Sequence, residues 1–131
     1  MRILIVEENR DLAGIWARFL ARQGMICTLA GTAAEAFTAL RDGTFEVMLL
    51  DMELSRGEAI SVADFATYRS PRLPIIAVTA RGFFSDGAIF QLVPNARGLL
   101  RTPLRLEDMA ALAEHYGGRH ASAQREAASG G

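Results

Sequence analysis

The stretch of sequence that decides the fold reads EVMLLD and occupies residues 46–51. Its four consecutive apolar residues stand between two acids. A short unbroken apolar run of this kind is typical of a strand that is buried on both faces, as strands are in a parallel sheet. We therefore expect a strand over Phe45–Leu50, which Asp51 closes.

Further apolar runs of similar length lie on both sides of this stretch, and we expect strands at Ile3–Val6, Met25–Leu29, Ile75–Val78 and Gly98–Leu100. Segments with helical spacing of apolar residues separate them. The predicted helices are residues 12–20, residues 33–40 after a Thr32–Glu35 capping box, Glu58–Arg69, Ser85–Leu92 and Leu106–Tyr116. Such alternation predicts a parallel sheet with helices on both faces.

The length of 131 residues fits one domain. Residues 1–116 carry the alternating pattern and form the predicted domain. Residues 117–131 are rich in Gly, Ser, Ala, Gln and Arg and show no apolar periodicity. We therefore expect residues 117–131 to be a disordered tail.

The basic residues restrict the chemistry. All 14 are arginine, since the chain has no lysine. A P-loop and Schiff-base catalysis both need lysine, so both are excluded. The net charge is −1 and the arginines are scattered, so we expect no nucleic-acid partner. The first apolar run is too short for a signal or membrane segment, and we expect a cytoplasmic protein without membrane contact.

Polar residues follow the predicted strands at the edge where an open parallel sheet binds its ligands. They are Glu7 and Glu8, Asp51, and Thr79. Carboxylates gathered at one edge repel one another unless a hard cation such as Mg²⁺ lies among them. A carboxylate beside Mg²⁺ can attack a phosphoryl group, and a threonine hydroxyl can donate to a phosphoryl oxygen.

These motifs resemble the receiver domain of bacterial two-component response regulators. The resemblance covers about residues 1–116 and rests on four stretches in order, which are Ile3–Glu8, Val47–Leu54, Leu73–Ala80 and Thr102–Pro103. It implies a flavodoxin-like, doubly wound, five-stranded parallel sheet with strand order 2-1-3-4-5. It also implies signalling by phosphorylation rather than metabolic catalysis, with slow self-dephosphorylation as the highest activity expected.

The resemblance assigns roles to residues. Asp51 is the phosphoacceptor, Thr79 is the switch hydroxyl, and Glu7, Glu8, Asp51 and the Glu53 carbonyl bind Mg²⁺. A histidine kinase or phosphotransfer protein is the implied donor, and an unidentified downstream protein receives the signal through protein contact, without an output domain of the chain's own. The sequence leaves dimerisation open.

The chain departs from the family pattern at several positions. Thr102 stands where the family has lysine, Leu99 replaces the aromatic switch residue, and Ser55 replaces a proline. Glu8 replaces aspartate, and its extra methylene weakens the expected Mg²⁺ site because Mg²⁺ demands tight octahedral geometry.

Arginines offer compensation for the missing lysine. Glu53 and Arg81 occupy the two positions that tune the phosphate site and form a candidate ion pair. Arg81, Arg56 or Arg101 could supply the missing cation, because a guanidinium binds phosphate well.

Two other hypotheses remain. The first is a degenerate pseudo-receiver, a phosphorylation-independent interaction module, which the combined departures favour. The second is a haloacid-dehalogenase-like phosphatase. That class also carries a lysine and a second Asp two residues after its nucleophile, whereas this chain has Glu53 there and no lysine.

Overall fold

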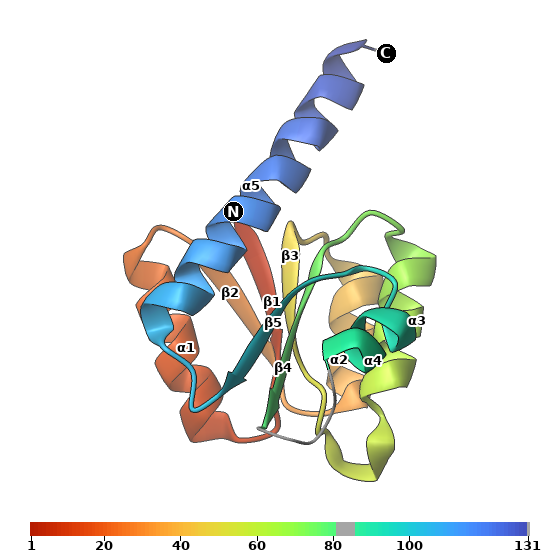
Figure 1. Ribbon diagram of the computed structural model, residues 1–131. Helices are drawn as coiled ribbons and strands as arrows, with labels where there is room; N and C mark the ends of the chain where they lie inside the picture. The colour runs from red at the N-terminus through yellow and green to blue at the C-terminus, as the bar shows by residue number, and fades with distance from the viewer. Residues whose placement is uncertain (81–85, 131) are drawn as a thin grey trace.

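A parallel sheet with strand order β2-β1-β3-β4-β5 forms the centre of the molecule (Figure 1). The structure is a computed structural model that describes residues 1–80 and 86–130, with side chains for residues 1–80 and 87–126. The strands are β1 (Arg2–Val6), β2 (Ile26–Ala30), β3 (Val47–Asp51), β4 (Ile75–Ala80) and β5 (Ala96–Thr102). The predicted fold class and strand order are confirmed.

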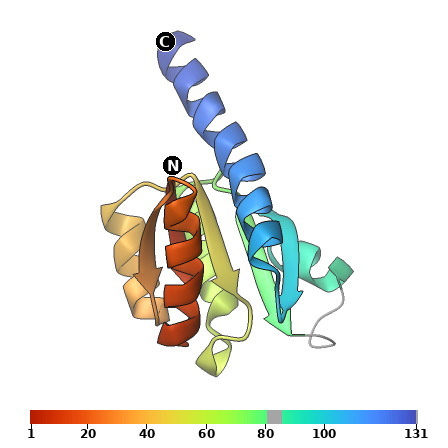
Figure 2. The ribbon, with the colours of Figure 1, turned by 90° about the vertical axis from the view of Figure 1, so that its left-hand side faces the viewer.

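Helices cover both faces of this sheet. They are α1 (Arg10–Arg22), α2 (Ala33–Asp42), α3 (Ala59–Arg69), α4 (Asp86–Leu92) and α5 (Leu106–Gly130), with a short 3-10 helix η1 (Ser55–Gly57). Helices α1 and α5 lie on one face, whereas α2, α3 and α4 lie on the other, as the two perpendicular views show (Figures 1 and 2). The two faces therefore each bury one layer of the sheet's side chains.

Strand β3 illustrates why the unbroken apolar run was informative. Met48 and Leu50 pack into the core beneath α2 and α3, whereas Val47 and Leu49 pack into the core beneath α1 and α5. All four side chains are fully buried. A strand in this central position needs apolar residues at every position because neither of its faces meets water.

Local signals in the sequence set where the helices begin and end. The Asn9 side chain accepts a hydrogen bond from the Leu12 N–H at 3.1 Å and caps α1. One half of the predicted capping box at α2 is present, because Thr32 accepts from the Glu35 N–H, whereas the Glu35 side chain accepts from the N–H of Gly31, one residue before the cap. Gly24 follows α1 with a φ of 88°, a conformation that favours glycine.

The C-terminal segment differs from the prediction. We expected disorder from residue 117, whereas α5 continues to Gly130 and its distal half projects past the end of the sheet (Figure 1). Its first half is docked through the buried Met109 and Ala113. The projecting half has no apolar stripe, but it contains four alanines and two arginines, which favour a helix by their intrinsic propensity, beside three glycines up to residue 130, which do not.

No helix in residues 1–80 or 86–130 combines the length and apolarity needed to span a membrane.

Candidate functional site

The register of the sheet brings the predicted site residues to one edge. Asp51 pairs with Val78 across β3 and β4, and Thr79 pairs with Arg101 across β4 and β5. Glu7 directly follows β1, whose neighbour is β3. Because all strands are parallel, their carboxyl ends meet there, in the lower part of Figure 1.

Glu7 and Asp51 form a carboxyl pair at the centre of this edge. The Glu7 side chain is only 7% exposed. Burial raises its pKa to about 8, and both the hydrogen bond to Asp51 and the negative charge of Asp51 act in the same direction. The Asn9 N–H partly opposes them by stabilising the Glu7 carboxylate. At neutral pH, Glu7 therefore mostly keeps its proton beside Asp51.

Glu53 links Asp51 to the end of β4. Its N–H donates to Asp51 Oδ1 at 2.9 Å. Its carboxylate Oε2 accepts a hydrogen bond from the Ala80 N–H and another from Thr79 Oγ1, at 3.4 Å for the latter. Thr79 is fully buried, so its hydroxyl is held in place by the surrounding core. The N–H and hydroxyl of these two β4 residues form a donor corner, which in this structure holds a carboxylate oxygen.

Glu8 turns to a different partner. Its Oε1 accepts from the Ser55 N–H at 3.1 Å and its Oε2 accepts from Ser55 Oγ at 2.7 Å. Ser55 begins η1, in which Arg56 adopts a φ of 65°. Glu8, Ser55 and Arg56 line one side of a groove of about 720 Å³ whose other side is the beginning of α2.

The donors of the predicted Mg²⁺ site are therefore only partly assembled. In the part of the chain that the structure describes, no group of three or more His, Cys, Asp or Glu side chains is arranged to hold a metal ion. Glu7 and Asp51 lie together, and their hard oxygens match a cation that often binds one or two carboxylates and several waters. The donor set thus fits Mg²⁺ through Glu7 and Asp51, whereas Glu8 is engaged by Ser55.

The position of the family lysine lies in apolar surroundings. Thr102 lines a cavity of about 460 Å³ together with Trp16, Pro103 and other residues of α1 and the β5–α5 connection. Leu99, at the aromatic switch position, packs against the core beneath α2 and α3. Neither residue supplies a charge or a ring to the site.

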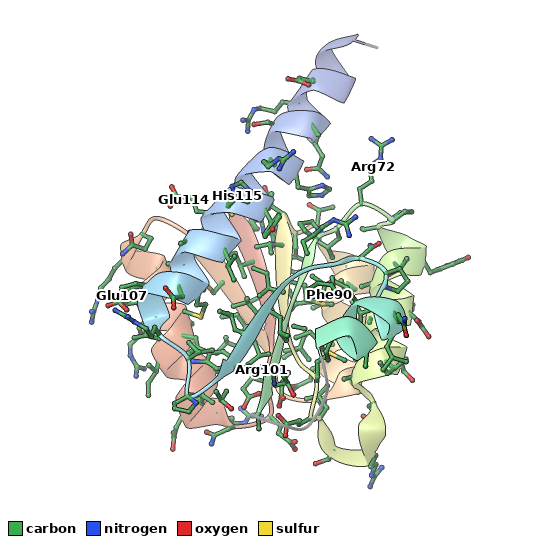
Figure 3. The ribbon with its side chains drawn as sticks, in the orientation of Figure 1. Arg72, Phe90, Arg101, Glu107, Glu114 and His115 are labelled. Atoms are coloured by element: carbon green, nitrogen blue, oxygen red, sulfur yellow. The ribbon has the colours of Figure 1, made fainter. Side chains whose placement is uncertain are left out.

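The three candidate arginines have different places. Arg101 is half-buried on β5 near the carboxyl edge, as its label in Figure 3 shows. In the register of β4 and β5 it lies opposite Thr79. Arg56 is exposed in η1. Arg81 lies outside the described residues, so the predicted Glu53–Arg81 pair stays a prediction.

Sequence reasoning missed two groups. Ser55 stood out only as a departure from the family pattern, whereas it binds both oxygens of Glu8. The Ala80 N–H is a backbone group, so the residue type at this position gives no hint of its role. The only available signal is the position of Ala80 after Thr79 at a strand end, where a backbone N–H needs a partner.

A doubly wound parallel sheet with a carboxyl pair and a buried threonine at its carboxyl edge defines the receiver class of signalling domain. The family model of the response regulator receiver domain matches residues 3–123, so the chain belongs to this family. This membership places the domain in two-component signalling.

Individual relatives agree with this assignment. The DNA-binding transcriptional regulator NtrC of Escherichia coli (strain K12) is 27% identical over 118 residues, which are 87% of this chain and 25% of the relative. The chain thus spans about a quarter of that relative's length.

Solved structures share the fold. A CheY-like receiver domain protein from Methanospirillum hungatei JF-1 has a TM-score of 0.82 at 23% identity, covering 92% of this chain and 96% of that one. The receiver domain of the sensor histidine kinase PA1611 from Pseudomonas aeruginosa PAO1 has a TM-score of 0.77 at 22% identity, covering 89% and 97%. The latter holds a magnesium ion in its active-site cleft.

Proposed function

We propose that Asp51 accepts a phosphoryl group from a phosphohistidine of a kinase or phosphotransfer protein, and that the modified domain signals by protein contact. The observation that carries this proposal is the Glu7–Asp51 carboxyl pair, which lies one strand away from the Thr79 and Ala80 donors. Family membership supports the class of donor. The domain is then a phosphoacceptor whose only catalysis is slow self-hydrolysis.

In the proposed step, a carboxylate oxygen of Asp51 attacks the phosphorus atom. The O–P bond forms as the P–N bond breaks, and the imidazole keeps the electron pair. Glu7 positions Asp51 through the hydrogen bond between the two carboxyl groups, and binding of Mg²⁺ would displace the proton that its raised pKa of about 8 retains. The N–H of Ala80 and the hydroxyl of Thr79, at the end of β4, are the donors proposed for the phosphoryl oxygens.

The carboxylates of Glu7 and Asp51 and the carbonyl of Glu53 are the groups that would hold Mg²⁺. The chemistry that the bound ion supplies is compensation of the negative charge that gathers as carboxylate and phosphoryl group approach. Arg101 brings a positive charge to the same edge from β5 and is the candidate for the role of the missing lysine.

Labelling with acetyl phosphate in the presence of Mg²⁺ tests the proposal by intact-mass spectrometry. We expect one added phosphoryl group on the wild type and none on Asp51→Asn. Asp64→Asn is the matched control, since Asp64 is an exposed aspartate on α3. The absence of any adduct, with acetyl phosphate and with phosphohistidine donors alike, would overturn the proposal and leave the phosphorylation-independent module.

A further inference from the structure

The donor corner at the end of β4 already contains an anion of the chain's own. Two donors, the Ala80 N–H and the Thr79 hydroxyl, converge on one oxygen of Glu53. The N–H of the same residue donates to Asp51. Glu53 therefore bridges the proposed phosphoacceptor and the corner that a phosphoryl oxygen would need.

A carboxylate and a phosphoryl oxygen compete for such a corner for two reasons. Both are anionic acceptors that gain most from charge-assisted hydrogen bonds, and the Ala80 N–H has only one hydrogen to give. Both also carry negative charge. The surroundings of Thr79 are fully buried, so the local dielectric is low and two like charges at hydrogen-bond distance repel each other strongly.

We propose that the Glu53 carboxylate is an internal occupant of the phosphoryl-oxygen corner, and that phosphorylation of Asp51 requires Glu53 to leave Thr79 and Ala80. This inference rests on the proposed function of Asp51. In the unmodified domain, Glu53 keeps the buried Thr79 hydroxyl and the Ala80 N–H engaged. In the phosphorylated domain, the phosphoryl oxygens take these donors and the Glu53 side chain turns to solvent.

The first experiment detects the occupied corner without phosphorylation. A charge-assisted hydrogen bond shifts an amide proton downfield in the NMR spectrum, so the Ala80 amide of the wild type should lie downfield of that in Glu53→Ala. Glu53→Gln should lie between them, because its amide oxygen accepts without a charge. Glu58→Ala removes the same charge from the following loop and should leave the Ala80 amide in place.

The second experiment measures displacement through the rate of labelling by acetyl phosphate. Removal of one hydrogen-bonding competitor should make Glu53→Ala about two- to tenfold faster than both wild type and Glu58→Ala. In the wild type, labelling should change the chemical shift of the Ala80 amide proton, because a phosphoryl oxygen replaces the Glu53 carboxylate as its acceptor. In Glu53→Ala, labelling should move the same proton downfield, because the phosphoryl oxygen is its first charged acceptor.

The outcomes separate the two proposals. Equal or slower labelling of Glu53→Ala relative to Glu58→Ala overturns the inference and leaves Asp51 as the acceptor. An Ala80 amide that is the same in wild type and Glu53→Ala also overturns it. If neither the wild type nor any variant is labelled, the proposed function fails. The difference in the Ala80 amide chemical shift between wild type and Glu53→Ala then decides by itself whether Glu53 fills the corner.

Discussion

Both oxygens of the Glu8 carboxylate are bound by one residue, Ser55, through its backbone N–H and its hydroxyl. This contact joins the second residue after β1 to the first residue of η1, which lie 47 positions apart. Glu8 and Ser55 both depart from the family pattern, and these two departures hydrogen-bond each other. The longer side chain of Glu8 reaches the loop, and a serine offers the N–H that a proline lacks.

A double-mutant cycle on Glu8→Ala and Ser55→Ala should give a coupling free energy of about 0.5–1.5 kcal/mol, which reports the hydrogen bond between Ser55 Oγ and Glu8 Oε2. Glu8→Ala removes both hydrogen bonds, whereas Ser55→Ala removes only this one because alanine keeps the backbone N–H. Urea unfolding of the four proteins provides the values. The pair Glu8→Ala and Ser61→Ala is the control, since Ser61 lines the same groove and has no hydrogen bond to Glu8 among those described. Additive effects of Glu8 and Ser55 would contradict the contact.

The Glu7 carboxyl should make stability depend on pH in magnesium-free buffer. Its pKa rises from 4.5 to about 8 on folding, so the folded protein binds more protons than the unfolded chain between these values. The free energy of unfolding of the wild type should therefore fall, relative to that of Glu7→Gln, as the pH rises from about 4.5 to about 8. The difference should level off at higher pH.

Chemical denaturation at a series of pH values checks this expectation. Glu107→Gln serves as the control because Glu107 is exposed on α5, and its curve should run parallel to that of the wild type. A Glu7→Gln curve that also runs parallel to the wild type would show that Glu7 ionises normally.

Two adjacent glycines test whether the helix continues past Tyr116. A methyl group at Gly118 meets open space, so Gly118→Ala should stabilise the protein by about 1 kcal/mol through helix propensity alone. At Gly117 the same methyl group would clash with the Met1 side chain and lie 3.3 Å from Val47 Cγ1. Gly117→Ala should therefore gain about 1 kcal/mol less than Gly118→Ala, or lose stability.

Thermal unfolding followed by circular dichroism gives both values. If residues 117 and 118 were disordered, the two substitutions would have the same small effect, and this result would contradict the extended α5.

Asn95 should be important for stability although it lies far from the site. Its buried Nδ2 donates to the carbonyls of Pro71 at 2.9 Å and Leu73 at 3.2 Å, and so ties the segment before β4 to the residue before β5. Asn95→Ala should cost about 1–3 kcal/mol in urea unfolding, because it leaves two carbonyls with fewer partners. Gln91→Ala, an exposed amide on α4, should stay within about 0.5 kcal/mol of the wild type.

Much of this architecture could be predicted because it depends on apolar patterns. The run at Val47–Leu50 required a strand covered on both faces, and the acid that ends it had to lie at the carboxyl edge of the sheet. The Thr32–Glu35 capping box was readable because its two partners are close in sequence. The predicted strand Gly98–Leu100 was too short at both ends, since β5 begins at Ala96 and Arg97 and finishes with the polar Arg101 and Thr102, which carry no apolar signal.

Other features were not accessible in this way. The helix beyond Tyr116 was missed because it is stabilised by propensity and by its docked first half, not by periodicity. The partners of Glu8 and Glu53 depend on side-chain rotamers and on backbone N–H groups of distant loops. Residue types alone placed these acids at the right edge, but they did not indicate to which donors they bind.

Helix α5 begins beside the edge that carries Asp51 and ends beyond the opposite edge of the sheet (Figure 1). With 25 residues, it is a rod of about 37 Å. A tilt of about 5° at its first turn moves its far end by about 3 Å, by the same rise per residue. A rotation of this size near Pro103 would therefore displace the far end of the helix, at the opposite pole of the molecule, by as much as the size of a side chain.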